Sequence, residues 1–275
     1  MNPLLKAQKI GFLGAGNMAQ AMIKGLIEGG IPANHIYATN RSEGKLVKLV
    51  EQYKINSLPN NEDLIDICDI IILAVKPQDL LTALEPVGRA FDENKIVISV
   101  AAGVRMQMLE RFLNGARIAR VMPNTPSVIG RGVIGYLLNE DEDDALESTV
   151  EDLFEPLGRV IKVTDEDQFE ALMISCSSGT GFVFEMMMYW QDWIEEHGFS
   201  IEEARVMTIE TFVGASLLAA QARENVEDLQ ARVTSKKGVT AAGLQSMREL
   251  EIERALRISF EKAAMRNKEM AREIK

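Results

Sequence analysis

Three small residues at a fixed spacing, Gly14, Gly16 and Ala19, directly follow the apolar run 10–13. Together they form Gly-x-Gly-x-x-Ala, a variant of the dinucleotide-binding fingerprint. The first glycine allows a tight turn from strand to helix, the second lets a pyrophosphate approach the backbone, and the alanine permits close helix–strand packing. We expect a helix from Asn17 to about Glu28, with its N-terminal N–H groups facing the phosphates. A glycine turn in another kind of α/β protein is the alternative.

The end of the next expected strand, 35–39, bears on the choice of cofactor. Enzymes that use NAD usually carry an acidic residue there, which holds the ribose 2′-hydroxyl and would repel a 2′-phosphate. This chain has Asn40, Arg41 and Ser42 instead. The planar, permanently charged Arg41 suits a phosphate group. We therefore expect NADP, with NADPH preferred over NADH; the alternative is an ordinary solvated arginine in a loop.

Continuous apolar runs at 69–75, 96–100 and 117–122 predict strands that are buried on both faces, as in a parallel sheet. Ligands of such sheets bind beyond the carboxyl ends of the strands. The segments that would converge at this edge are 14–18, 40–42, 74–77, 101–103 and 123–126. The predicted fold class is α/β, with an N-terminal Rossmann-type dinucleotide-binding domain. Residues 130–138 and 160–163 are expected to close the sheet, and the acidic run 140–144 to begin a solvated helix.

From about residue 164 the pattern changes from strands to long helices, expected at 165–196, 200–223 and 239–275, with a loop at 233–238. The first of these helices is expected to break at 177–181. The second begins with a capping box, Ser200 and Glu203. We therefore predict a dinucleotide-binding domain at 1–164 and an all-helical domain at 165–275. Large apolar residues on several faces of the segment 186–193 favour a helix buried between subunits over a simple monomer core.

Composition excludes several classes of function. The chain has 275 residues, of which 47% are apolar and 26% charged, and its net charge is −11. With no basic stripe, a nucleic-acid partner is not expected. Two cysteines, Cys68 and Cys176, and two histidines make disulfide and metal sites poor interpretations and fit a reducing cytoplasm. We expect no apolar run to reach the roughly 18–20 residues of a membrane span, and the strand expected from residue 9 leaves no room for a signal peptide.

Over nearly its whole length the chain resembles the bacterial pyrroline-5-carboxylate reductases. The resemblance is carried in the first domain by the segments 10–19, 73–77, 100–103 and 121–126, and in the second by 211–220, 233–235 and 238–244. Unrelated Rossmann dehydrogenases would share the first segment alone.

The resemblance implies reduction of the cyclic imine 1-pyrroline-5-carboxylate to L-proline by NAD(P)H. It also implies a helical domain that intertwines with a partner subunit, giving a homodimer and, in larger assemblies, often a decamer. The cofactor contacts implied by position are Gly14, Ala15, Gly16, Asn17, Met18, Asn40, Arg41, Ser42, Asn61, Ala74, Val75, Lys76, Pro77 and Ala102.

The implied substrate loop departs from the family pattern. The family reads Ser-Pro-Gly-Gly-Thr-Thr, whereas residues 235–240 here read Ser-Lys-Lys-Gly-Val-Thr. Ser235, Gly238, Val239 and Thr240 are the implied substrate contacts, with Thr240 as the catalytic residue, an orienting hydrogen-bonding group rather than a strong acid. The lysines at 236–237 either attract the substrate carboxylate, mark a diverged paralogue, or reflect drift in a tolerant loop.

A second departure lies at 176–182, where the family's Ser-Gly-Ser-Gly-Pro-Ala-Tyr is here Cys-Ser-Ser-Gly-Thr-Gly-Phe. Two alternative functions remain open at this point. β-Hydroxyacid dehydrogenases place a catalytic lysine one turn after the glycine-rich break, and residues 182–193 contain no lysine. An NADPH-binding paralogue with a regulatory, competence-related role would bind the nucleotide without reducing the imine.

Overall fold

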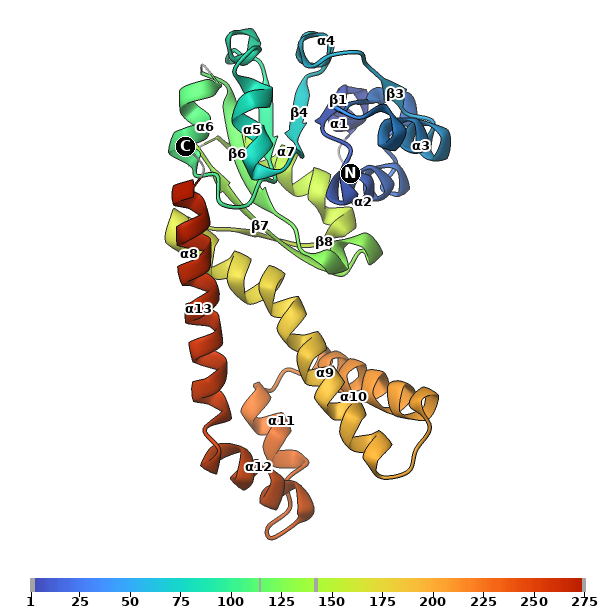
Figure 1. The fold of residues 1–275 in the computed structure, drawn as a ribbon, viewed down its shortest axis with the longest axis vertical. Helices are drawn as coiled ribbons and strands as arrows, with labels where there is room; N and C mark the ends of the chain where they lie inside the picture. Colours follow the sequence, from blue (N-terminus) through green and yellow to red (C-terminus); the bar gives the residue numbers. More distant parts are fainter. Residues whose placement is uncertain (1–2, 114, 141–142, 274–275) are drawn as a thin grey trace. The chain divides into compact units, whose positions relative to one another are not determined.

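The computed structural model describes residues 3–113, 115–140 and 143–273, which form two compact units (Figure 1). The first unit takes in the chain as far as Ser177 and again from Ala264, and the second unit is 178–263. The first unit continues past residue 164 because α8, Glu166–Leu172, packs against a strand of the sheet. The functional division into 1–164 and 165–275 stays a prediction.

The first unit is built on an eight-stranded sheet in the order β3-β2-β1-β4-β5-β6-β7-β8. The strands are β1 Ile10–Leu13, β2 Ile36–Thr39, β3 Asn56–Ser57, β4 Ile70–Leu73, β5 Ile96–Ser99, β6 Arg117–Met122, β7 Gly132–Leu138 and β8 Gly158–Lys162. Neighbouring strands are parallel except β6 and β7, which are antiparallel. The predicted α/β class, its parallel strands and the two closing strands are confirmed.

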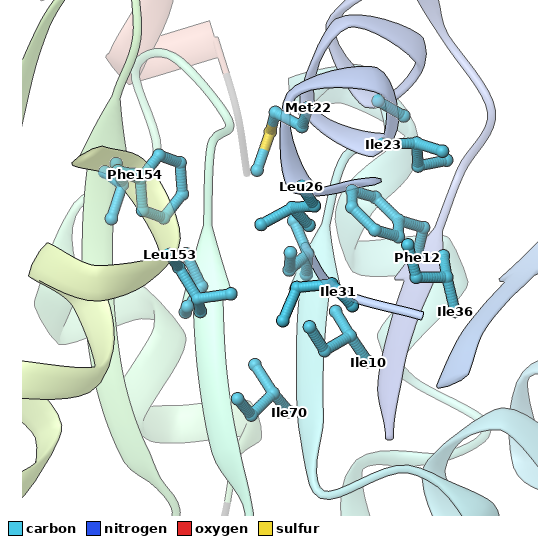
Figure 2. Close-up of a cluster of buried hydrophobic side chains, with 14 of the residues drawn as sticks. Ile10, Phe12, Met22, Ile23, Leu26, Ile31, Ile36, Ile70, Leu153 and Phe154 are labelled. Atoms are coloured by element: carbon cyan, nitrogen blue, oxygen red, sulfur yellow. The ribbon is translucent and has the colours of Figure 1, made fainter. Parts of the chain in front are cut away.

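One face of the sheet carries the large hydrophobic core shown in Figure 2. Side chains from β1, including Ile10 and Phe12, meet Met22 and Leu26 of α2 and Phe154 of α7 in this cluster. The helices that contribute to it are α2 Asn17–Glu28, α3 Glu43–Tyr53 and α7 Asp144–Phe154. Because strand side chains alternate between faces, Ile10 and Phe12 point into this core while the intervening Gly11 faces the other way.

The opposite face is covered by α4 Asn61–Ile67, α6 Met106–Phe112 and α8, and α5 Pro77–Leu84 follows β4. A Cβ on Gly11 would lie 2.9 Å from both the Cys68 sulfur and Leu64 Cγ, so α4 packs directly on the β1 backbone. All four residues of β4 are buried, since both faces of this strand are covered. Such burial explains the continuous apolar run from which the strand was predicted.

The second unit consists of helices with few buried side chains. They are α9 Gly179–Glu196, α10 Ile201–Gln221, α11 Val226–Arg232, α12 Val239–Glu249 and the part of α13, Ile252–Glu273, that precedes Ala264. Trp190 of α9 and Phe212 of α10 meet edge to face, with ring centroids 5.5 Å apart. Of residues 178–263, only Gly179, Ile194, Ala204 and Thr208 are buried. The predicted capping box of Ser200 and Glu203 is present.

Two predictions about the helices were wrong. The helix expected to break at 177–181 instead contains a π-helical turn at Met173–Ser178, and Gly179 and Gly181 lie within α9. A π turn accommodates an extra residue without ending the helix, so the glycines do not act as breakers. The expected helix 239–275 is two helices, because Glu251 between them has a left-handed φ of 52°. Helices α1 Pro3–Ala7 and α11 were not expected.

The stretch Glu166–Glu196, which runs from α8 through the π turn into α9, is long and apolar enough to cross a membrane by length and composition. The expectation that no segment reaches this length was wrong. The helix continues through the π turn, where a break was expected, and its apolar residues therefore add up over one long element. As predicted, the acidic run leads into a helix, and Asp143 caps α7; residues 141–142 lie outside the described part of the chain.

Candidate active site

The turn between β1 and α2 brings several predicted cofactor residues together. Gly14 has a φ of +110°, and a Cβ there would lie 2.8 Å from the Ala74 carbonyl oxygen. A side chain is therefore excluded both by the backbone conformation and by the neighbouring strand end. The N–H of Ala15 donates to Asn40 Oδ1 over 3.1 Å. The ends of β1, β2 and β4 thus meet at one edge of the sheet, as the sequence predicts.

Gly16 borders open space at this turn. A Cβ on Gly16 would have one neighbour within 4 Å, the Ala74 carbonyl oxygen at 3.8 Å. Gly16 is the N-cap of α2 and supplies no side-chain hydrogen bond, and no described residue accepts from the backbone N–H groups of Asn17 and Met18. Open space in front of unpaired N–H groups at a helix start suits the pyrophosphate of a dinucleotide.

A small polar network orders the end of β2. The Asn40 side-chain amide donates to the Ser42 carbonyl oxygen over 2.7 Å and to the Ser42 hydroxyl over 3.0 Å. Arg41, whose side chain is 88% exposed, has Nη1 3.2 Å from Oδ1 of Asp79. Asp79 lies in the first turn of α5 and was not among the predicted site residues. Asp79 thus pairs with one nitrogen of the Arg41 guanidinium group, the group that is predicted to bind a 2′-phosphate.

Other predicted cofactor residues lie on the same edge, and they differ in how firmly hydrogen bonds and packing hold them. Asn61 is tied into the fold, because its Oδ1 accepts from the Thr39 hydroxyl over 2.8 Å and its Nδ2 donates to Ala83 over 3.4 Å. Lys76 is exposed and caps α5, with Pro77 at the first helical position. Val75 lies against Gly14, since a Cβ there would be 2.9 Å from Val75 Cγ1. Ala102 follows β5, the neighbour of β4.

Asn124, at the end of β6, joins this edge to the π turn. Its Oδ1 accepts from the N–H of Val133 over 2.9 Å, and its Nδ2 donates to the carbonyl oxygen of Cys176 over 3.2 Å. The residue is buried. Sequence analysis placed 123–126 on the edge but did not single out Asn124 as the link to the long helix. The buried hydroxyl of Ser177 in the same turn has no hydrogen-bond partner among the described residues.

A buried ion pair fixes the turn that follows β5. Arg120 is 4% exposed and pairs with Glu166 of α8, whose other oxygen accepts from the N–H of Met106 over 2.8 Å. The Arg120 guanidinium also stacks 4.2 Å above the ring centre of Phe169. Burial lowers the pKa of Arg120, which the Glu166 carboxylate opposes. Removing Glu166 would leave the Arg120 charge buried without a partner, so the pair holds α6 and α8 in place.

The predicted substrate residues form an exposed loop that begins α12. The N–H of Gly238 donates to Ser235 over 3.0 Å, and a Cβ on Gly238 would lie 2.2 Å from the Ser235 hydroxyl. Within the described chain, the backbone N–H groups of Val239 and Thr240 have no acceptor. Val239 is 92% exposed, and Thr240 is exposed as well. Free N–H groups at the start of an 11-residue helix are suited to a carboxylate.

Lys237, in the same loop, has a φ of +59°. This left-handed conformation favours glycine, and the family motif that the chain resembles has glycine at this position. Thus the loop keeps the backbone turn while replacing the residue that suits it. The predicted cofactor residues lie near one another in the first unit. The predicted substrate residues lie near one another in the second unit. The roles of both sets stay predictions.

Comparisons with known proteins match both parts of the chain. Residues 9–103 match the family described as NADP oxidoreductase coenzyme F420-dependent, and residues 166–270 match pyrroline-5-carboxylate reductase dimerisation. Pyrroline-5-carboxylate reductase 1 of Bacillus spizizenii is 32% identical over 100% of this chain and 93% of its own. The chain belongs to the pyrroline-5-carboxylate reductase family. The predicted resemblance is confirmed, and the chain is an oxidoreductase of this family.

Solved structures of the reductase family agree with the fold. A pyrroline-5-carboxylate reductase from Coxiella burnetii has a TM-score of 0.86 and 33% identity, covering 97% of this chain and 98% of its own. The Plasmodium falciparum pyrroline carboxylate reductase, solved with NADP bound, has a TM-score of 0.85 at 24% identity, covering 97% and 99%. The N-terminal unit of this family member thus has the fold of a pyridine-nucleotide oxidoreductase. No comparison favours a β-hydroxyacid dehydrogenase or a regulatory paralogue.

Proposed function

We propose that the chain catalyses NADPH-dependent reduction of 1-pyrroline-5-carboxylate to L-proline, the last step of proline biosynthesis. The supporting observation is the match along the whole chain to a reductase of the same name, with the nucleotide-binding and dimerisation regions both present. A nucleotide-binding domain alone would leave the substrate open, since one fold hosts many reactions. We place this reaction in the cytoplasm, whose reducing conditions suit Cys68 and Cys176, two cysteines that form no disulfide in the described chain.

The residues of the sheet edge fit a dinucleotide. Gly14 and Gly16 provide the turn and the open approach, and the N–H groups of Asn17 and Met18 hold the pyrophosphate. The remaining predicted contacts, Ala15, Asn40, Arg41, Ser42, Asn61, Ala74, Val75, Lys76, Pro77 and Ala102, line the same edge. Arg41 is exposed enough to reach a 2′-phosphate, which supports the preference for NADPH over NADH.

The reaction asks for position more than for acid–base strength. Bound NADPH supplies the hydride that adds to the carbon of the C=N bond, and the nitrogen ends as an amine. Because a protonated imine is already an electrophile, the chain's task is to orient it and keep water away. The Thr240 hydroxyl holds the nitrogen, and the free N–H groups of Val239 and Thr240 hold the carboxylate. Ser235 and Gly238 shape the loop that presents them.

We further propose a homodimer formed through the helical domain, 165–275. Large apolar side chains there are exposed in the single chain, including Phe184, Tyr189, Trp193, Val206 and Leu218, each at 56% or more. A monomer core would have buried them, and contiguous apolar patches of this kind mark protein interfaces. Such dimers would also be the units of a decamer. The same interface accounts for the apolar stretch Glu166–Glu196 without a membrane.

The decisive assay is oxidation of NADPH by the purified protein with 1-pyrroline-5-carboxylate, run beside pyrroline-2-carboxylate and a hydroxyacid. We expect turnover with the first substrate and little with the others. NADPH binding without turnover would overturn the reductase assignment and favour a regulatory paralogue. Repeating the assay with NADH gives the cofactor preference, and light scattering of the same sample gives the number of subunits.

A further inference from the structure

A pocket lined by cations lies in the first unit, between the turn after β5 and the end of α13. Its volume is about 390 Å³, within the range of small-molecule sites. Arg105 and Arg111 line it from one segment, and Lys268 and Arg272 line it from the other. None of its lining residues is acidic. The chain as a whole has a net charge of −11, whereas the lining of this pocket carries four positive charges.

Among the described residues, only one of these four cations is paired with a carboxylate. Lys268 has Nζ 3.6 Å from Oε2 of Glu170. The side chains of Arg105, Arg111 and Arg272 make no ion pair or hydrogen bond with any described residue. Arginine side chains are usually satisfied by a carboxylate, a phosphate or water. Three guanidinium groups that face one hollow without a protein partner leave their hydrogen-bonding capacity to a ligand.

The position of Arg105 is unfavourable for the fold itself. Arg105 is the N-cap of α6 and makes no capping hydrogen bond. A cation at a helix N-terminus faces the positive end of the helix dipole, which is destabilising, whereas Arg111 and Arg272 near helix C-termini are favourable. Helix stability therefore explains Arg111 and Arg272 but not Arg105. The Arg105 side chain neither caps α6 nor pairs with a carboxylate of any described residue, and it lines the pocket, where it can meet an anionic ligand.

We propose that this pocket binds a small molecule that carries two or more phosphate groups. Guanidinium forks match phosphate oxygens in a bidentate manner, and three unpaired guanidinium groups require more than one anionic charge for neutrality. The site is distinct from the predicted nucleotide edge, none of whose proposed contact residues lines it. The two are neighbours in the chain, because Gly103, which also lines the pocket, follows Ala102. A ligand that holds Gly103 and Arg105 would restrain the turn that carries Ala102.

The test is isothermal titration of tripolyphosphate into the full-length protein saturated with NADPH, so that the nucleotide edge is filled. Titration of NADPH alone first establishes that this saturation occurs. We expect one tripolyphosphate per chain, with affinity that weakens as salt rises. The charge-reversed variant R111E/R272E should bind at least about tenfold more weakly. A control variant, R89E/K48E, reverses two exposed cations that do not line the pocket and should bind within about twofold of wild type.

A second variant guards against misfolding. Arg105→Gln removes the cation at the helix start, so it should weaken tripolyphosphate binding without lowering the thermal midpoint, measured by circular dichroism. Equal affinity in wild type, R111E/R272E and R105Q would overturn the proposal. So would loss of tripolyphosphate binding when NADPH is present, because the probe would then be occupying the nucleotide edge. Neither result depends on whether the protein reduces an imine.

Discussion

Arg41 and Asp79 form an ion pair that links the segments after β2 and β4, the two strands that flank β1, with Nη1 and Oδ1 3.2 Å apart. Asp79 belongs to the first turn of α5, and Arg41 follows β2. Because Arg41 is 88% exposed, the pair contributes about 0–1 kcal/mol, and a 2′-phosphate of about two negative charges can displace the carboxylate. Asp79 would therefore compete with a 2′-phosphate for Arg41, the residue that we propose selects NADP.

Two substitutions should move cofactor preference in opposite directions. Arg41→Ala should raise the KM for NADPH by about tenfold and leave the KM for NADH nearly unchanged, since NADH has no 2′-phosphate. Asp79→Asn frees the guanidinium and should lower the KM for NADPH by about two- to fivefold. Steady-state kinetics with both cofactors measures this. Equal effects of R41A on the two cofactors would remove Arg41 from 2′-phosphate recognition.

Thr240→Ala should lower turnover by about 10- to 100-fold, the loss expected for one hydrogen bond to the reacting nitrogen. The KM for NADPH should not change, because the predicted cofactor residues lie in the other unit. Thr240→Ser keeps the hydroxyl and is the matched control, which should retain most activity. An undiminished rate for T240A would show that this hydroxyl does not orient the imine.

Lys237→Gly should stabilise the protein by about 0.5–1 kcal/mol, because glycine adopts the left-handed φ of +59° without strain. Lys237→Ala removes the charge but keeps a Cβ, so it should not stabilise. Denaturant unfolding of the two variants separates conformation from charge. If the lysine also attracts the substrate carboxylate, both variants should raise the KM for 1-pyrroline-5-carboxylate alike. A KM equal to wild type in both would leave the lysine without a part in binding.

Val206→Glu with Leu218→Glu should convert the dimer to a monomer, because both side chains are more than half exposed in the single chain and would be buried in an interface. Light scattering at micromolar concentration measures the mass. Arg223→Glu changes an exposed polar side chain at the end of the same region and is the control for added negative charge. A wild-type protein that is itself monomeric would refute the interlocked dimer.

Asp143→Asn tests the ion pair that joins β6 to α7. Arg117 Nε donates to Asp143 Oδ2 over 2.6 Å, and this contact holds the Asp143 pKa below its usual value. The stabilisation is therefore complete at neutral pH and is lost as pH falls through the lowered pKa. Asparagine can still cap α7, so the helix start should be kept. The free energy of unfolding of D143N should be about 1 kcal/mol lower than that of wild type at pH 7, and the difference should be smaller near pH 3. A constant difference across this range would contradict the assignment.

Sequence alone predicts those parts of the fold that local chemistry determines. The run at β4 has no polar residue because both faces of the strand are covered, and the Gly14–Gly16 turn is dictated by close contact with Ala74. The contact between Arg41 and Asp79 spans 38 residues, and no local pattern could pair them.

The misplaced helix features have equally specific causes. Gly179 and Gly181 suggested a break, but the irregular backbone is the preceding π turn, which accepts a hydrogen bond from Asn124 in the segment after β6. The helix ends after α12 because Glu251 adopts a left-handed conformation. No glycine or proline at this point of the sequence indicates such a break. Tertiary contacts decide both, so residue preferences could not locate them.

Because few of residues 178–263 are buried, folding and assembly of this protein should be coupled. A helical unit with four buried residues cannot offset the entropy of its own ordering, so residues 178–263 must complete their folding during association with another copy. Its thermal midpoint should then rise with protein concentration. Newly synthesised chains would finish folding at a rate that depends on the square of their concentration. Dilution would separate the subunits and thereby unfold these helices.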